Sequence, residues 1–298
     1  MTNCDRDKLA RMDQNPASRA ATWKLASRSL SFSEMPLLMG IINVTPDSFS
    51  DGGKFLSHHA AVEHGLQLVE QGANILDIGG ESTRPYSMPV SEDDELRRVL
   101  PVIESLCEQT QVAVSVDTSK ARVAREAVAA GAEIINDVTG LQRDPAMLPV
   151  AIDTKSGVCV MHMQGTPQVM QDNPSYTDVV LEIDGYLRDR RDALISAGID
   201  PERICLDPGI GFGKSHEHNL TLLANCHRLH GLGHPLLVGH SRKGFIGNVL
   251  GDKNSDRTAG STGVALAMAS QGVQVLRVHD VTPVREALIL FLAAGGLP

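Results

Sequence analysis

Short apolar runs recur along most of the chain, and each run ends in a polar or charged residue. Runs that are apolar at consecutive positions are typical of strands buried on both faces, as in parallel sheets. The eight runs are LLMGIIN (37–43), NILDIGG (74–80), VAVSVD (112–117), EIIND (133–137), GVCVMHM (157–163), RICLDPG (203–209), PLLVGHS (235–241) and VQVLRVHD (273–280). The pattern predicts eight buried strands.

The segments between these runs have the spacing of amphipathic helices. Residues 91–109 open with Ser91, a preferred N-cap residue, followed by acidic residues that the helix dipole favours. Gly131 and Gly198 follow the last apolar positions of two further helical segments, where glycine commonly ends a helix. Strands that alternate with helices predict a parallel sheet.

Eight strand–helix units predict an α/β fold, a closed TIM (β/α)8 barrel. A doubly wound open sheet is the main alternative, and the absence of G-x-G-x-x-G after the first strand disfavours its nucleotide-binding form. No linker interrupts the series, so we expect one barrel domain over residues 36–298. Residues 1–35 are expected to be a partly disordered N-terminal extension in which 22–34 form a hairpin and Trp23 plugs the barrel or the hairpin core.

Composition and charge narrow the possible classes of protein. The longest uninterrupted apolar run among the 298 residues has eight, far below the roughly 20 needed to span a bilayer. A net charge of -9 disfavours broad nucleic-acid binding. The five cysteines lack paired spacing, and the N-terminus lacks the apolar core of a signal peptide. We therefore expect a cytoplasmic protein with neither nucleic acid nor a membrane as partner.

Polar residues at the strand ends are the candidates for a functional site, because TIM barrels carry their active sites at the carboxyl ends of the strands. Each residue alone is equally explained as a turn or capping residue. If the barrel closes, however, all of them meet at one mouth, which predicts a polar pocket. These residues are Asn43, Asp77, Asp117, Asn136, Asp137, His162, Asp207, His240, Ser241, Arg277 and His279.

The chemistry of these side chains favours an anionic, heterocyclic ligand. Arg277 and His279 are two positions apart on one strand, so they face the same way and suit a phosphate. Carboxylates accept hydrogen bonds, an amide donates and accepts, and an ammonium group donates. The side chains suited to the edge of a flat ring are Asp117, Asn136, Asp207 and Lys243. Two long polar loops, 43–55 and 79–91, are candidate lids or ordinary connections.

The motifs around these residues resemble those of the dihydropteroate synthase family. They follow the order of that family over residues 37–280, nearly the whole predicted barrel. They are MGIINVTPDSFSDGG (39–53), DIGGESTRP (77–85), VSVDTSK (114–120), INDVTGL (135–141), VMHMQGTP (160–167), DPGIGFGK (207–214), LVGHSRKGFIG (237–247) and LRVHD (276–280).

The resemblance implies a transferase of folate biosynthesis that joins 6-hydroxymethyl-7,8-dihydropterin pyrophosphate to p-aminobenzoate. Asp117, Asn136, Asp207 and Lys243 would bind the pterin ring, Met161 and Phe212 would line its pocket, and Arg277 would lie against its face. Asn43, Arg277 and His279 would bind the pyrophosphate, with Mg²⁺ beside Asn43. The loop residues Phe49, Asp51, Thr83, Arg84 and Pro85 would close the p-aminobenzoate end.

The resemblance also implies catalytic roles for Asp117, Lys243, Asp51 and Arg84, and an SN1-like path through a pterin carbocation. It implies a homodimer formed through the last helices, and a target for sulfonamides. One position departs from the family pattern, because Gly244 stands where many members have serine after S-R-K. The second loop likewise has RPYSM where RPG is common. We therefore expect a roomier p-aminobenzoate end.

Two other functions fit parts of the same sequence. A methyltetrahydrofolate:corrinoid methyltransferase would share the pterin-binding residues without needing a pyrophosphate site. A barrel that has lost catalysis would act as a binding subunit. The NVTPDSFSDGG and RVHD motifs favour the synthase over the methyltransferase. The presence of Asn43, Asp117, Lys243, Arg277 and His279 argues against a barrel without catalysis.

Overall fold

The computed structural model describes residues 19–45, 53–82, 87–167 and 169–297. Eight parallel strands form the centre of the molecule, in the order β8-β7-β6-β5-β4-β3-β10-β9. Their bounds are β3 (Leu37–Asn43), β4 (Ile75–Gly79), β5 (Ala113–Asp117), β6 (Ile134–Asp137), β7 (Gly157–Met161), β8 (Ile204–Asp207), β9 (Leu237–Val238) and β10 (Val275–Val278). All eight predicted strands are confirmed.

The two end strands of this order meet and close the barrel. A parallel bridge joins Leu206 to Leu236, and the N–H of Leu206 donates to the carbonyl of Pro235 at 2.9 Å. An open sheet would leave its end strands apart, so the doubly wound alternative is wrong and the TIM barrel is confirmed.

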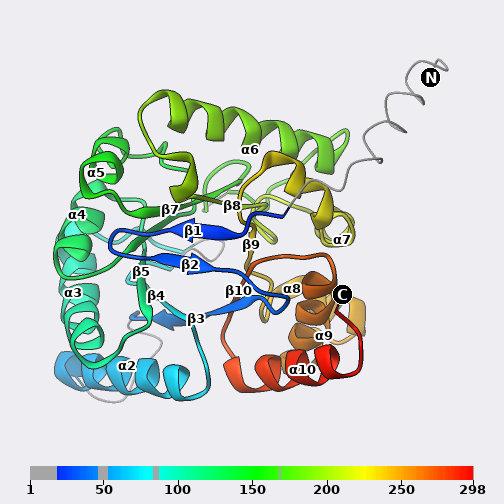
Figure 1. Cartoon of the computed structure of the whole chain (residues 1–298), viewed down its shortest axis with the longest axis horizontal. Coiled ribbons are helices and arrows are strands. Elements are labelled where there is room, and N and C mark those ends of the chain that lie inside the picture. The colour runs from blue at the N-terminus through cyan, green and yellow to red at the C-terminus, as the bar shows by residue number, and fades with distance from the viewer. Residues whose placement is uncertain (1–18, 46–52, 83–86, 168, 298) are drawn as a thin grey trace.

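Helices surround the barrel (Figure 1). They are α2 (Gly53–Glu70), α3 (Glu92–Gln109), α4 (Ala121–Ala129), α5 (Met147–Thr154), α6 (Val179–Ser196), α7 (His216–Ala224), α8 (Gly244–Leu250), α9 (Thr258–Ser270) and α10 (Val281–Ala293), with the 3-10 helices η2 (Pro201–Arg203) and η3 (Cys226–Leu232). The predicted caps are confirmed: the Ser91 hydroxyl accepts from the N–H of Asp94 at 3.1 Å, and Gly131 and Gly198 have φ of +113° and +106°. In these ranges no helix is long and apolar enough to cross a membrane.

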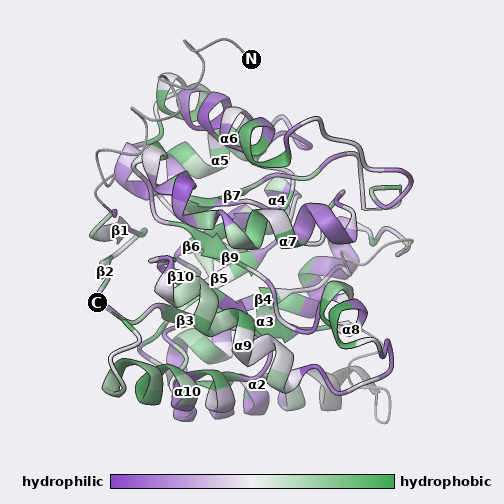
Figure 2. Ribbon diagram, turned by 90° about the vertical axis from the view of Figure 1, so that its right-hand side faces the viewer, coloured by the Kyte–Doolittle hydropathy of each residue, from purple (hydrophilic) through white to green (hydrophobic). Residues whose placement is uncertain are grey.

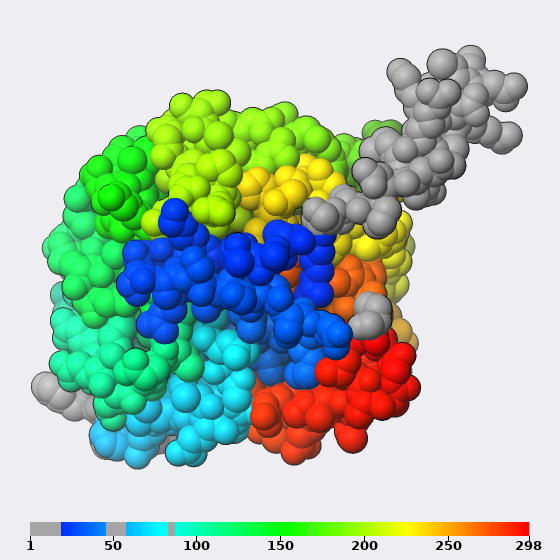
Figure 3. All heavy atoms as spheres, viewed as in Figure 1, coloured from blue at the N-terminus to red at the C-terminus, as the bar shows by residue number. Residues whose placement is uncertain are grey.

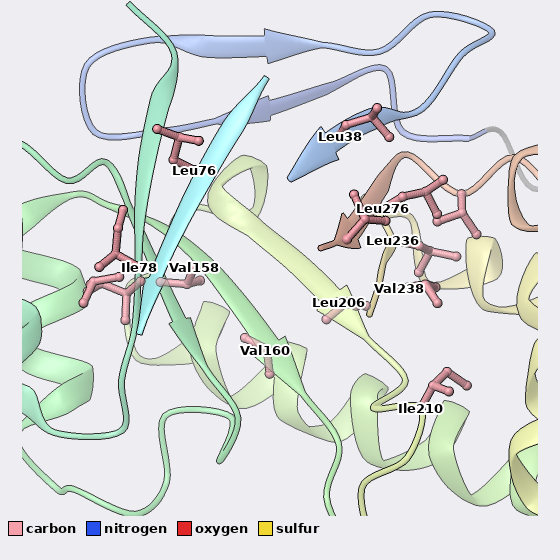
Figure 4. Close-up of a cluster of buried hydrophobic side chains, with 14 of the residues drawn as sticks. Leu38, Leu76, Ile78, Val158, Val160, Leu206, Ile210, Leu236, Val238 and Leu276 are labelled. Carbon is pink, nitrogen blue, oxygen red and sulfur yellow. The ribbon is translucent and has the colours of Figure 1, made fainter. Parts of the chain in front are cut away.

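Alternate strand residues point outward and form the main apolar core beneath the helices. Figure 4 shows this packing for Leu76, Val158 and Leu206, which are fully buried. Coloured by hydropathy, the strands are mostly hydrophobic, whereas α6 and α7 carry hydrophilic stretches (Figure 2). The consecutive apolar positions noted in the sequence therefore serve two cores, one outside the strands and one inside.

The inward-facing residues form two layers that differ in chemistry. Nearest the amino ends of the strands is an apolar layer, here called the lower layer: Met39, Ile75, Ala113, Ile134, Cys159, Cys205, Leu237 and Val275. Because side chains alternate along a strand, the next inward residues lie two positions further on. This upper layer consists of Ile41, Asp77, Ser115, Asn136, Met161, Asp207, Gly239 and Arg277.

An N-terminal hairpin covers the lower layer. Strands β1 (Thr22–Lys24) and β2 (Ser29–Ser31) pair antiparallel, and Trp23 and Leu25 are buried against the lower layer. The indole Nε1 of Trp23 donates to the carbonyl of Arg203 at 2.9 Å, which satisfies its one polar group. Figure 3 shows the hairpin, in blue, spread across this face. The predicted hairpin and the predicted plug role of Trp23 are both confirmed.

Candidate active site

A cavity of about 1480 Å³ opens at the carboxyl ends of the strands, above the upper layer. Residues at or after the ends of seven strands, β3, β4, β5, β7, β8, β9 and β10, line it, although these segments are far apart in sequence. The predicted residues that line it are Asn43, Asp117, Phe212, Ser241, Lys243, Gly244, Arg277 and His279. This volume exceeds the about 300–1,000 Å³ that is common for pockets of small molecules, so the cavity has room for more than one small ligand.

Arg277 links two carboxylates in the floor of this cavity. Its Nε donates to Oδ2 of Asp77 at 2.6 Å, and one terminal nitrogen donates to Oδ2 of Asp117 at 2.7 Å. The amide of Asn136 also donates to Oδ2 of Asp77, at 3.1 Å. The Arg277 side chain is 21% exposed and that of Asp77 is fully buried. One cation is thus held between two anions, with its open side toward the cavity.

Burial dominates the electrostatics of this group. It raises the pKa of Asp117 to about 7, against the opposing effect of Arg277 and with help from the negative charge of Asp77. Burial alone would lower the pKa of Arg277, but Asp77 and Asp117 outweigh it and raise that pKa. Arg277 therefore stays charged, while Asp117 titrates near neutrality, a property common among functional groups.

Lys243 also lines the cavity. Its ammonium group donates to the carbonyl of Ile210 and lies 4.5 Å from the ring centroid of Phe212, a cation–π distance. Burial lowers the pKa of Lys243 to about 8, although Asp207 acts to raise it. Burial also raises the pKa of Asp207, whose Oδ1 accepts from the N–H of Gly209 at 2.7 Å.

Asn43, Ser241 and His279 form the rim nearest β3 and β10. The Ser241 hydroxyl lies 3.1 Å from Nδ1 of His279 and accepts the N–H of His279 at 3.2 Å, which fixes the imidazole. His279 and Arg277 line the same cavity, as their spacing predicted. This polar rim lies on the same cavity as the Arg277 guanidinium, which is suited to an anionic group on a ligand.

Comparison with known proteins identifies the family. The pattern of the pterin binding enzymes matches residues 39–279. Dihydropteroate synthase of Escherichia coli (strain K12) is 47% identical over 253 residues, 85% of this chain and 89% of that protein. The enzyme of Bacillus subtilis (strain 168) is 45% identical over 254 residues, 85% of this chain and 86% of that protein.

Solved structures of dihydropteroate synthases are also similar to this chain. Dihydropteroate synthase of Xanthomonas albilineans with 4-aminobenzoic acid has a TM-score of 0.86 and 48% identity, covering 94% of this chain and 100% of that one. A Yersinia pestis dihydropteroate synthase with a sulfonamide drug complex has a TM-score of 0.86 and 44% identity, covering 92% and 99%. The chain belongs to the dihydropteroate synthase family.

The structure brings most of the predicted site of this synthase family together. Asn136, Met161 and Asp207 lie in the upper layer directly beneath the cavity, and the other described candidates line it. Gly244 lies at the cavity edge, and a Cβ built there meets no atom within 4 Å, so the absent side chain leaves open space. The remaining predicted residues lie outside the described ranges: Phe49, Asp51, Thr83, Arg84 and Pro85.

Three polar strand-end residues do not join the mouth, so that part of the prediction is wrong. Asp137, next to the inward Asn136, points outward and accepts from the N–H groups of Thr139 and Leu141. His240 is fully buried on the outer side, where Nε2 bonds the carbonyl of Ser261 at 3.0 Å. His162 is likewise packed away from the floor, and burial lowers its pKa to about 3. The alternation of side chains, which a count of strand ends ignores, is the cause.

The structure gives two residues of the site a role that the sequence did not assign. Asp77, predicted at the mouth without a role, is the closest partner of Arg277; a carboxylate inside an otherwise apolar strand is the signal for this, because buried charges require partners. Lys214 was not singled out, although it is only 2% exposed and lies beside the cavity. Nothing in its local sequence distinguishes it from a surface lysine.

Mg²⁺ is the one cofactor that the family implies, with Asn43 as the predicted ligand. Among the described residues there is no group of three or more His, Cys, Asp or Glu side chains that could hold a metal ion. Asn43 offers a single amide oxygen to the cavity. Because Mg²⁺ often keeps several waters and is held largely by substrate phosphates, Asn43 fits a cation that enters with a diphosphate.

Proposed function

We propose that this protein condenses 6-hydroxymethyl-7,8-dihydropterin pyrophosphate with p-aminobenzoate, giving 7,8-dihydropteroate and pyrophosphate in folate biosynthesis. The observation that carries the proposal is the Asp77–Arg277–Asp117 group at the same cavity as Lys243, in a chain of this family. The relatives from Xanthomonas albilineans were solved with 4-aminobenzoic acid and with 7,8-dihydropteroate, which supports both substrate halves.

The pterin ring is proposed to lie on the cavity floor. Asp117 and Asp207 accept from its N–H groups, Asn136 donates and accepts, and Lys243 donates to a ring nitrogen or carbonyl. Met161 and Phe212 form the apolar walls, and the Arg277 guanidinium lies against the ring face, since arginine stacks on flat π-systems. Every one of these described side chains lies in the upper layer or lines the cavity.

The pyrophosphate is proposed to lie at the rim, where Asn43, Arg277 and His279 converge. Asn43 would contribute one oxygen to a Mg²⁺ ion, which would neutralise charge on the departing pyrophosphate. Arg277 is placed to stabilise the negative charge that develops on the bridging oxygen as the carbon–oxygen bond breaks. The net charge of -9 is compatible with this anionic substrate because Arg277 and Lys243 line the same cavity.

The reaction is proposed to follow an SN1-like path. Loss of pyrophosphate leaves a carbocation on the exocyclic methylene of the pterin, and the negative field of Asp117 favours it. The neutral amine of p-aminobenzoate then forms the carbon–nitrogen bond and releases a proton. Asp51 and Arg84 are proposed as further catalytic residues, and Phe49, Thr83 and Pro85 as p-aminobenzoate contacts, from the resemblance alone. A steep dependence of the saturated rate on amine basicity would contradict this path.

Three further properties are part of the proposal. A domain of residues 36–298 follows an extension of 1–35, and the protein is cytoplasmic. It is a homodimer, which is supported by Ile289 and Leu290 on α10, 40% and 69% exposed apolar side chains on one of the last helices. Sedimentation of the purified protein at several concentrations tests the dimer.

A coupled assay for pyrophosphate release tests the proposed function. Release should require the pterin pyrophosphate, p-aminobenzoate and Mg²⁺ together, and Asp117→Asn should abolish most of it. A corrinoid methyltransferase would release no pyrophosphate and would transfer a methyl group instead, while a binding subunit would bind a pterin without turnover. Absence of release under all conditions would refute the proposal.

A further inference from the structure

The loop after β8, residues 209–214, has a conformation that depends on its glycines. Gly209, Gly211 and Gly213 have φ of +69°, +83° and +58°, where glycine is favoured. A Cβ at Gly209 would lie 1.9 Å from the carbonyl oxygen of His162. This loop runs along the wall of the cavity and carries Phe212.

Side chains from outside the loop and from its own end bind five consecutive carbonyl oxygens. Such dense side-chain satisfaction is unusual, because loop carbonyls are commonly left to water. Lys243 donates to Ile210, Gln171 to Gly211 at 2.8 Å, Lys214 to Phe212 at 2.9 Å, Tyr176 to Gly213 at 2.7 Å and Asn219 to Lys214 at 3.4 Å. The loop is therefore held in one conformation before any substrate binds.

Lys214 is the central member of this set. Besides donating to the carbonyl of Phe212, its Nζ lies 3.0 Å from Nδ1 of His162 and donates to the carbonyl of His162 at 3.4 Å. Burial lowers the pKa of Lys214 well below its usual value. His162 directly follows β7, and its ring meets that of Tyr186 edge-on at 4.8 Å. Lys214 thus joins the ends of β7 and β8 through one ring nitrogen and two carbonyl oxygens.

Lys214 affects the substrate site through the backbone carbonyl of Phe212. The carbonyl that Lys214 binds belongs to Phe212, whose ring is half-buried, lines the cavity and lies 4.5 Å from the ammonium group of Lys243. We infer that Lys214 is a positioning residue for pterin recognition, which holds Phe212 and Lys243 in their relative places without contacting the substrate. The inference rests on the proposed function, in which both residues bind the pterin.

Lys214→Met tests this inference, because methionine keeps the length of the side chain but cannot donate. We expect the KM for the pterin pyrophosphate to rise about tenfold, since small misplacements of binding groups carry large kinetic costs. The KM for p-aminobenzoate should change less than twofold. Lys155→Met is the matched control, because its side chain is exposed before β7, at the opposite end of the barrel.

Tyr176→Phe is a second variant that removes only the hydrogen bond to Gly213. It should raise the same KM about threefold, because one of five loop contacts is lost. If Lys214→Met does not fold, the inference is tested by the pterin KM of Tyr176→Phe alone. An unchanged pterin KM in the folded variant, or an equal rise in the KM of both substrates, overturns the inference.

Hydrogen–deuterium exchange separates this inference from the proposed function, because it needs no activity. The peptide containing residues 209–214 should exchange faster in Lys214→Met than in the wild type or Lys155→Met, since exchange reports local opening. Unchanged exchange contradicts the positioning role even if the enzyme is active. If exchange is faster in Lys214→Met but the wild-type protein releases no pyrophosphate, the positioning role of Lys214 is supported and the proposed function is refuted.

Discussion

The lower and upper layers of the barrel interior lie on the same eight strands, two residues apart, yet one is an apolar core and the other is the floor of the cavity. The lower layer is apolar and is sealed by Trp23 of the hairpin. The upper layer contains Asp77, Asn136, Asp207 and Arg277 and forms the floor of the cavity. A barrel interior thus becomes a functional site where charged side chains replace apolar ones. Each buried charge then needs a hydrogen-bonding or oppositely charged partner among the neighbouring strands. Substitutions in either layer test this division of roles.

Arg277→Met should cause the largest loss, because it leaves Asp77 and Asp117 buried without their cation. We expect kcat/KM to fall by about 10³ and the free energy of unfolding to fall by about 3 kcal/mol, measured by steady-state kinetics and urea unfolding. Arg125→Met, which removes an exposed ion pair with Asp153, is the control and should change stability by less than about 0.5 kcal/mol. Near-normal stability of Arg277→Met would show that the upper layer tolerates unpaired carboxylates.

Trp23→Ala tests the lower layer. Removing a fully buried indole should lower the free energy of unfolding by about 3–5 kcal/mol. Both KM values should stay within twofold of the wild type, because the hairpin lies at the end of the barrel opposite the cavity. Thr22→Ala, an exposed position on the same strand, is the control. A selective rise in one KM would show that the two layers are coupled.

Asp117→Asn tests the titration of the floor. The pKa of Asp117 is about 7 in the folded protein, above its usual value of 3.8. Between pH 4 and 7 the folded protein therefore holds a proton that the unfolded chain releases, so this group makes the free energy of unfolding fall as pH rises. Asp117→Asn should flatten that slope in urea unfolding from pH 4 to 7.5, and lower kcat/KM about a hundredfold. An unaltered slope contradicts the raised pKa.

Gly244→Ser should have the smallest effect, because its side chain enters open space at the cavity edge. We expect stability within about 0.5 kcal/mol of the wild type and tighter binding of p-aminobenzoate and sulfonamides by a few-fold, through one added hydrogen bond. Calorimetric titration with each ligand measures this change. Equal affinities of the two proteins would show that Gly244 does not enlarge this end of the site.

Most of the fold was predictable because local signals agreed with one another. Consecutive apolar positions, Ser91 at a helix start and Gly198 at a helix end each carry their physical cause within a few residues. The site was predictable only in part. Asn136 and Asp137 are neighbours of similar polarity, but the first points into the barrel and the second outward, where it caps a turn. That choice depends on the register of a strand relative to the closed ring.

Local composition and spacing are enough to specify the eight strands, the order of helices between them and the motifs of the dihydropteroate synthase family. The tertiary structure alone decided which charges meet. Asp77 and Arg277 are 200 positions apart, and only closure of the barrel places their side chains at 2.6 Å. Lys214 is similar, since its partner His162 is 52 positions away. Burial then shifts the pKa values of these groups, an effect that depends on everything packed around them.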